Sequence, residues 1–379
     1  MEKSISSNQA GLILILFTVG LKFSVLPAIM CDYASNNGYI VCLIALVLDF
    51  LCTVAVILIM RKIPEKTFFD LIKDTLSRPV AIVIYSILAM FFLIKCLIAI
   101  LELHDYFIAT LFEELNPMYF FLVLMLLMFF LFNKNFRTFG RLLEVFFWPM
   151  AIGLMFTLIF PIQDIELTNL FPIFQDGFYP IWKGIVHTSF AFGDYTILLI
   201  LMGRISYKKK SVKKILIYMF SMLNFIFNFY IVFVGTFGDT AINQTLALGE
   251  LPLHNPYPST IGKLEWLTII IWTAILTIEA GMLGKSASNC FGQIFNISKP
   301  LIPSIITTSI LTLLFATSYL RLEKAVQIAT DGTVVTIASL FQLMLIIILY
   351  VCFFINKKQK SKVPKGEINV QRSKKDYQK

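Results

Sequence analysis

Five charged side chains interrupt long apolar segments of this chain, and their types indicate which chemistry the protein could perform. They are two bases and three acids, each near the centre of its segment: Lys22, Asp49, Lys95, Asp194 and Glu279. A charge at the centre of a membrane span costs about 2.5–3.5 kcal/mol on insertion scales, so such a residue is retained for a function or to neutralise a partner. Bases together with acids suit a small ligand that carries both charges.

The residue types argue against an enzyme. The three histidines, at positions 104, 187 and 254, lie far apart in the sequence and lack the spacing of a metal-binding motif. The six cysteines show no paired ligand spacing, and most lie in apolar segments, where cysteine behaves as a small hydrophobic residue. We therefore expect no catalytic residues, no metal site, no disulfide framework and no cofactor.

Two of the buried charges have alternative interpretations. Asp49 and Lys95 fit a purely structural ion pair between the second and third apolar segments. Lys95 and Glu102 are seven residues apart and hence on one helix face, which also admits a water-filled cavity along that helix.

The elements that position these charges are membrane-spanning helices. Of the 379 residues, 58% are hydrophobic and 15% are charged, with a mean hydropathy of +0.80, whereas soluble domains carry about 25% charged residues. Apolar segments of about 20 residues, the length that spans a bilayer, recur along the chain with only short connections. They predict ten spans, at residues 10–30, 39–60, 80–103, 118–132, 142–160, 182–203, 214–236, 266–284, 301–320 and 334–355.

The spans predict one domain with a defined topology. Residues 1–356 are expected to form a single transmembrane domain, followed by a basic tail, 357–379, that lacks large apolar residues and should be disordered. The first five spans (about 9–160) and the last five (about 182–355) would form two repeats, inverted because each has an odd number of spans. With the N-terminus inside, the inner connections and the tail hold 26 of the 32 Lys and Arg residues. This positive-inside bias places both termini on the cytoplasmic side.

The net charge of +9 does not indicate a nucleic-acid partner, because the basic runs lie next to the predicted spans. Such runs set the topology and attract anionic lipid headgroups. Residues 63–76 combine apolar and charged side chains in the manner of an amphipathic helix, which we expect to lie along the inner membrane surface.

Two spans carry a glycine close to a charge at their centres. In the first span these residues are Gly20 and Lys22, and in the sixth they are Gly193 and Asp194. Glycine weakens a helix, and broken helices in corresponding places of two inverted halves indicate a ligand site at the bilayer midplane. The sequence therefore predicts two broken helices that face a common site.

Five short stretches of the sequence occur in an order and spacing typical of one family. They are Gly20 to Pro27, Tyr39-Ile40-Val41, Ile63-Pro64-Glu65, Ser189 to Asp194 and Leu264-Glu265-Trp266. Across residues 9 to 356 the chain resembles the spore germination permease family, the B subunits of nutrient germinant receptors, within the amino acid-polyamine-organocation transporter superfamily. The resemblance implies an all-α polytopic membrane protein with about ten helices in a five-plus-five inverted repeat, the first and sixth helices being broken.

The resemblance also implies a site. Gly20 would open the first helix, and Phe190 to Gly193 would be the unwound part of the sixth, with Asp194 standing where relatives often carry an acid. Lys22 departs from the family pattern, in which a small or neutral residue is expected. Since the first and eighth helices are neighbours in this architecture, either Asp194 or Glu279 could pair with Lys22. The predicted ligand-binding residues are Gly20, Lys22, Phe23, Ser24, Lys95, Phe190, Phe192, Gly193, Asp194 and Glu279.

The function implied by the resemblance is nutrient sensing. The chain would be a subunit of a spore germinant receptor in the inner membrane of the spore, would bind a small nutrient such as an amino acid, and would have A and C subunits as partners. A proton-coupled amino-acid transporter of the same fold is the alternative, and a fold alone does not separate binding from transport.

Overall fold

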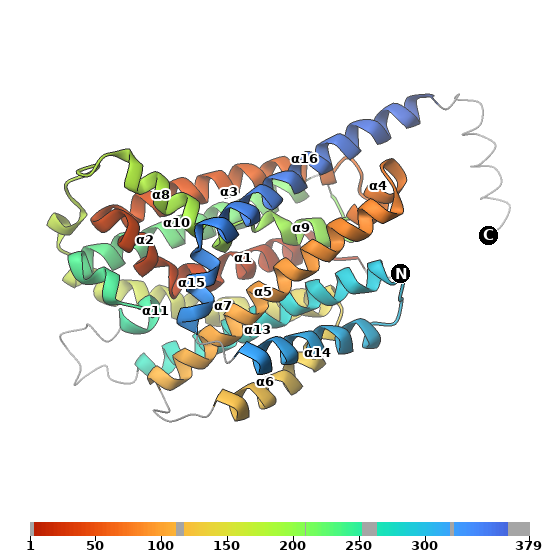
Figure 1. Cartoon of the computed structure of the whole chain (residues 1–379). Helices are drawn as coiled ribbons and strands as arrows, with labels where there is room; N and C mark the ends of the chain where they lie inside the picture. The colour runs from red at the N-terminus through yellow and green to blue at the C-terminus, as the bar shows by residue number, and fades with distance from the viewer. Residues whose placement is uncertain (1–3, 111–116, 209, 252–263, 319–321, 363–379) are drawn as a thin grey trace.

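The computed structural model describes residues 4–110, 117–208, 210–251, 264–318 and 322–362. Within these ranges the regular elements are helices, apart from one isolated bridge between Ile5 and Ile205. Most of the long helices run along a common direction and form an elongated bundle (Figure 1). The predicted all-α class is confirmed.

Ten helical segments correspond in order to the ten predicted spans. Seven helices of the described residues are long and apolar enough to cross a membrane, and three shorter apolar helices, Ser7–Gly20, Tyr119–Phe132 and Leu301–Phe315, accompany them. The chain is therefore a multi-pass membrane protein. The segments are α1 (Ser7–Phe23), α3 (Gly38–Met60), α5 (Arg78–Thr110), α6 (Pro117–Phe132), α7 (Phe136–Ile159), α8 (Phe178–Thr188) with α9 (Tyr195–Leu201), α10 (Ser211–Phe237), α13 (Leu264–Ile294), α14 (Leu301–Ser318) and α16 (Gly332–Lys362).

Shorter helices connect these segments or flank them. Four are α-helical: α2 (Leu26–Ala34), α4 (Phe68–Thr75), α11 (Ala247–Glu250) and α15 (Leu322–Thr330). Five are 3-10 turns: η1 (Ser35–Asn37), η2 (Phe160–Asp164), η3 (Leu167–Leu170), η4 (Ser189–Ala191) and η5 (Gly238–Asn243).

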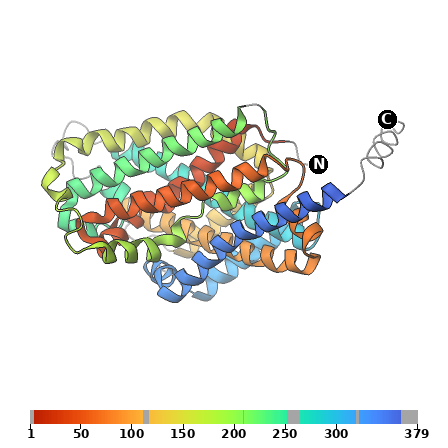
Figure 2. The ribbon, with the colours of Figure 1, turned by 90° about the horizontal axis from the view of Figure 1, so that it is seen from above.

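The core of the bundle is built around α1, α5 and α13. Among the described helices α5 and α13 form the most extensive pair, while α1 packs on α10 and α7. Seen from above, α7 and α10 lie along one side of the bundle and α16 along the other (Figure 2). Close packing depends on small residues: a Cβ atom at Gly284 of α13 would overlap the Phe132 ring of α6.

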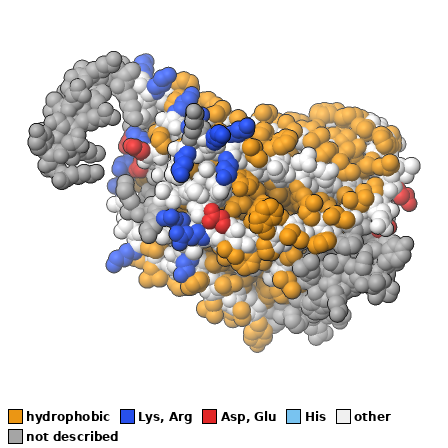
Figure 3. All heavy atoms as spheres, turned by 180° about the vertical axis from the view of Figure 1, so that it is seen from behind, with side chains coloured by type: hydrophobic (Ala, Val, Ile, Leu, Met, Phe, Trp, Pro, Cys, Tyr) orange, Lys and Arg blue, Asp and Glu red, His pale blue; other side chains and the backbone are white. Residues whose placement is uncertain are grey.

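Surface chemistry divides the molecule into a lipid-facing belt and a basic end. Large apolar side chains such as Leu126, Val145 and Leu340 are 75%, 71% and 62% exposed, as expected where the solvent is lipid. Figure 3 shows that Lys and Arg side chains gather at one end. This is the end at which α1 begins and α16 ends (Figure 1), and it is the end that the positive-inside bias assigns to the cytoplasm.

Two segments at the basic end differ from the sequence-based expectation. The amphipathic segment forms α4, but its apolar side chains, including Phe68 and Ile72, are buried against the protein, where α4 packs on α5 and α16. Helix α16 continues to Lys362, so the first residues of the tail that we expected to be disordered are helical. The next helix-breaking residue, Pro364, lies outside the described residues, as does the rest of the tail.

Candidate functional site

Both predicted helix breaks are confirmed. The backbone of Gly20 leaves the helical conformation (φ −24°, ψ −115°), α1 ends at Phe23, and α2 begins at Leu26. In the sixth span α8 ends at Thr188, one 3-10 turn follows, and α9 begins at Tyr195. The two interruptions divide their spans at matching places, one in each half of the chain.

The two glycines serve different purposes. Gly193 has φ +85°, a conformation that favours glycine, and a Cβ atom there would also press on the side-chain amide of Gln342. At Gly20 a Cβ atom would overlap the carboxyl group of Glu279 on α13. The missing side chain at Gly20 thus allows an acid of the eighth span to lie directly against the first break.

A buried ion pair joins the two breaks. Lys22 Nζ lies 2.7 Å from Asp194 Oδ2, and the two side chains are 2% and 0% exposed. The same ammonium lies 4.9 Å from the centre of the Phe192 ring. Of the two acids considered for Lys22, the structure selects Asp194, while Glu279 lies beside the first break without an ion pair to Lys22.

The expected ion pair between Asp49 and Lys95 is wrong, because both side chains bind backbone groups of the second break instead. Asp49 Oδ1 accepts hydrogen bonds from the N–H groups of Gly193 (3.1 Å) and Asp194 (3.2 Å). Lys95 Nζ donates to the carbonyl oxygens of Phe192 (2.9 Å) and Ala191 (3.5 Å).

The physical reason for this arrangement is the exposed backbone of an unwound helix. Interrupting a helix leaves N–H groups without acceptors and carbonyl groups without donors, and the interior of a membrane protein offers little water to satisfy them. A carboxylate that accepts from the N–H groups and an ammonium that donates to the carbonyl groups meet both needs. Asp49 and Lys95 are therefore structural supports of the break.

The tenth span adds a second support that the sequence analysis missed. The Tyr195 hydroxyl donates to the main-chain carbonyl of Gln342 (2.6 Å), and the Gln342 side-chain amide reaches the Phe192 carbonyl (3.4 Å). The hydroxyl groups of Ser189 and Ser339 lie 2.6 Å apart. A buried glutamine in an apolar span was the signal available in the sequence, since amides in a membrane bind other helices.

The predicted site residues do not all meet. A cavity at the breaks is lined by Phe17, Thr18, Lys22, Lys95, Ala191, Glu279 and Leu283, so three of the predicted residues line it. Phe23 instead packs into an aromatic cluster, its ring centre lying 4.6 Å from that of Phe229 on α10. The cavity measures about 10 Å³, roughly the space that one water needs. In this conformation the site is closed, and ligand binding by these residues stays a prediction.

The sequence matches one protein family over most of its length. A family model described as "Spore germination protein" matches residues 4–326. The chain belongs to the spore germination protein family. Spore germination protein YndE of Bacillus subtilis (strain 168) is 22% identical over 296 residues, which cover 74% of this chain and 80% of that protein. This member of the family is thus a germination-related, permease-like membrane protein and not an enzyme.

Solved structures similar to this spore germination protein are transporters. A mutant form of the Eremococcus coleocola manganese transporter superposes with a TM-score of 0.63 at 10% identity, covering 98% of this chain and 93% of that one. The same transporter bound to an aromatic bis-isothiourea compound gives a TM-score of 0.54 at 10% identity, covering 96% and 90%. At this identity the likeness shows the fold alone. Among the described residues no group of three or more His, Cys, Asp or Glu could hold a metal ion.

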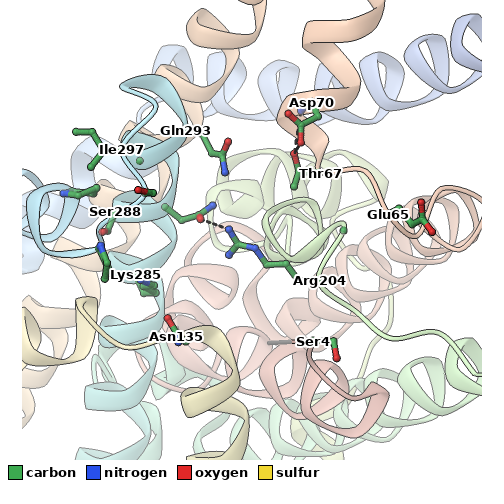
Figure 4. A pocket seen from close by; sticks show the side chains of 16 residues that line it. Ser4, Glu65, Thr67, Asp70, Asn135, Arg204, Lys285, Ser288, Gln293 and Ile297 are labelled. Atoms are coloured by element: carbon green, nitrogen blue, oxygen red, sulfur yellow. Dashed lines mark hydrogen bonds between the residues drawn. The ribbon is translucent and has the colours of Figure 1, made fainter. Parts of the chain in front are cut away.

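Hollows lie on both sides of the closed cavity. At the basic end a hollow of about 750 Å³ is bordered by Glu65, Asp70, Arg204 and Lys285, among others. Arg204 reaches across it to donate to Asn289 Oδ1 on α13 at 2.5 Å (Figure 4). The hollow therefore lies at the basic end, and on α13 its lining begins at Lys285, two residues after Leu283 of the closed cavity.

The outer hollow is smaller and acidic. It measures about 610 Å³ and its lining includes Asp32 of α2 and Asp105 of α5, together with Val25 at the start of α2. Val25 directly follows the first break, so this hollow approaches the closed cavity from the other side.

Proposed function

We propose that this spore germination protein is the nutrient-sensing subunit of a germinant receptor, and that it binds a small zwitterion, an amino acid, between its two helix breaks to trigger germination. The observation that carries the proposal is the buried Lys22–Asp194 pair, which joins the breaks in the absence of room for a ligand. The ligand would occupy the place where these two charges now meet.

A zwitterion matches this pair in both charge and position. The carboxylate of an amino acid competes with Asp194 for Lys22, and its ammonium competes with Lys22 for Asp194. Inserting the ligand between the two side chains keeps every charge paired, so the exchange avoids the cost of an isolated buried charge. Lys95 and Glu279 line the same cavity and would complete the site around the ligand.

Binding must be accompanied by opening of the bundle, because a cavity of about 10 Å³ holds no amino acid. The breaks at Gly20 and Gly193 are the points at which α1, α2, α8 and α9 could pivot. A ligand that binds the opened conformation shifts the population toward it by its differential affinity for the two conformations. Such a shift is the signal that a receptor subunit would transmit.

Family membership supports the biological setting of the proposal. We place the protein in the inner membrane of the spore, with the A and C subunits of a germinant receptor as partners and with anionic lipid at its basic end. The name of the Bacillus subtilis relative refers to germination, and the Lys and Arg side chains at one end suit contact with lipid headgroups.

A second function, proton-coupled transport of an amino acid, is favoured by one specific observation. Hollows of about 750 Å³ and 610 Å³ approach the closed cavity from opposite ends, as alternating access would require. The solved structures of similar fold are described as those of a manganese transporter. Uptake of labelled amino acids by proteoliposomes tests this function directly.

The test of sensing is a germination assay on spores whose only copy of the gene carries Lys22→Met. We expect the nutrient concentration for half-maximal germination to rise at least tenfold, with a matched control, Lys213→Met, unchanged because that lysine is exposed at the basic end. Protein abundance is measured in parallel on immunoblots. A Lys22→Met spore with normal abundance and normal nutrient sensitivity would remove this site from the proposal.

A further inference from the structure

The buried charges of the bundle do not balance. Lys22 pairs with Asp194, and Lys95 and Asp49 each bind backbone groups of the second break. Two further buried acids remain: Glu102 on α5, 0% exposed, and Glu279 on α13, 6% exposed. Neither forms an ion pair among the described side chains, although Lys22 and Lys95 line the same cavity as Glu279. The third buried lysine, Lys285 on α13, donates to the Phe132 carbonyl. Among the described residues four buried acids therefore stand against three buried lysines.

Glu102 is the more isolated of the two acids. Both of its carboxyl oxygens are fully buried, and the polar group beside them is the Ser24 hydroxyl at the end of the first break, which is itself buried. Glu279 Oε2 is also buried, without a hydrogen-bond partner among the described residues. Glu102 is near enough to act on Glu279 electrostatically.

Two residues that border the outer hollow are close in sequence to Glu102 and Ser24. Asp105, one helical turn beyond Glu102 on α5, borders the hollow, as does Val25, the residue after Ser24. Glu102 itself lies two turns beyond Lys95 on the same face of α5. The acids therefore form a series from the outer hollow, through Asp105 and Glu102, to Glu279 at the first break.

We propose that Glu102 and Glu279 form a proton-binding site that exchanges protons with the outer side through the hollow bordered by Asp105. An ionised carboxylate without a partner is strongly disfavoured inside a membrane protein, whereas the protonated acid is neutral and can donate a hydrogen bond to its neighbour. Two adjacent acids that share protons remove both the excess charge and the unpaired oxygens.

The size and chemistry of the site favour a proton over other cations. The cavity beside Glu279 measures about 10 Å³, which leaves no space for an organic ammonium ion. A metal ion needs several ligands, and the described residues offer no group of three or more His, Cys, Asp or Glu for one. A proton needs only one oxygen and no coordination shell.

Charged groups of several helices act on the pair. α5 contributes Lys95 and Asp105, and α1 contributes Lys22. Asp194, directly before α9, also acts on Glu279 through its charge. His104 lies two residues after Glu102 in the sequence, and its Nδ1 is 3.0 Å from Asp105 Oδ1. Asp49 of α3 is occupied by the second break.

Proton binding at this pair would couple conformation to external pH. The closed state holds the protons, whereas opening toward the outer hollow admits water and lets the acids ionise. Because the closed state binds more protons than the open state, lowering the external pH stabilises the closed state. Glu279 also lines the cavity proposed for the nutrient, whereas Glu102 does not. The experiment below is made without any ligand, so its result does not depend on nutrient binding.

The experiment is infrared spectroscopy of the purified full chain in lipid vesicles, without any ligand. We expect a carbonyl band of protonated carboxylic acid at neutral pH, shifted when the protein is made with isotope-labelled glutamate. Glu102→Gln and Glu279→Gln should each remove about half of the band. The matched control Glu166→Gln should leave the band unchanged, because Glu166 is an exposed residue.

Two results would overturn the proposal. The first is a wild-type spectrum without a protonated glutamate band at neutral pH. This measurement needs no variant, so misfolding of a mutant protein cannot affect it. The second is a band that persists in both Gln variants, which would assign the protons to other acids. Glutamine has nearly the shape of a protonated glutamate side chain, so we expect both Gln variants to fold and to reach normal abundance.

Discussion

Breaking the ion pair between Lys22 and Asp194 on one side should cost more stability than removing both charges. Both side chains are buried and their charged atoms lie 2.7 Å apart. Removing one partner of a buried pair leaves an uncompensated charge, at a cost of about 3–5 kcal/mol. Lys22→Met leaves the carboxylate of Asp194 alone, and Asp194→Asn leaves the ammonium of Lys22 alone.

The double variant contains neither isolated charge. Methionine and asparagine have nearly the volumes of the residues they replace, and a buried pair exchanged for neutral side chains of similar size is often neutral in stability. We expect a coupling free energy of at least about 2 kcal/mol between the two substitutions, near the upper part of the range for residues in contact. The value is set below the full cost of an isolated charge because Asp49 and Glu279 also act on Lys22 electrostatically.

The assay is a double-mutant cycle on the purified protein, with the free energy of unfolding measured by titration with a denaturing detergent. The matched control is Lys66→Met with Asp74→Asn, whose charged atoms lie 2.6 Å apart but whose side chains are 29% and 44% exposed. Exposed pairs contribute about 0–1 kcal/mol, so this cycle should show little coupling. Costs that are additive within about 0.5 kcal/mol at Lys22 and Asp194 would refute the reasoning.

Three further predictions test other parts of the structure. Gly193→Leu should abolish the nutrient response at unchanged protein level, because a side chain is strained at φ +85° and would press on Gln342. A germination assay measures the response and immunoblots measure the protein level. Normal nutrient sensitivity would contradict the role of the second break. Tyr195→Phe should lower stability by about 0.5–1.5 kcal/mol through loss of one buried hydrogen bond, detected as a lower thermal midpoint, whereas an unchanged midpoint would show that the bond contributes nothing. Cysteines placed at Asn36 and at Gln359 should react with membrane-impermeant reagents from opposite sides, and labelling from the same side would exclude the ten-span topology.

Much of the fold was accessible from the sequence because its signals are local. Runs of about 20 apolar residues define helices that cross a bilayer whatever their neighbours are, and the predicted segments and observed helices correspond in order. Gly20 and Gly193 weaken their own helices, so both breaks were predictable from one position and its immediate neighbours. The length of α16 and the burial of α4 were less well predicted, because they depend on packing.

The partners of the buried charges were decided by the tertiary structure alone. The sequence positions of Lys22, Asp49, Lys95 and Glu279 indicate that these charges are buried. They do not indicate the partner of each charge, because a charge has no preferred direction and pairs with whichever opposite group the packing brings near. Asp49 and Lys95 meet unwound backbone instead of each other, since an interrupted helix exposes donors and acceptors that no residue type reveals. Only the packing of α1 against α9 and α13 decided that Lys22 pairs with Asp194.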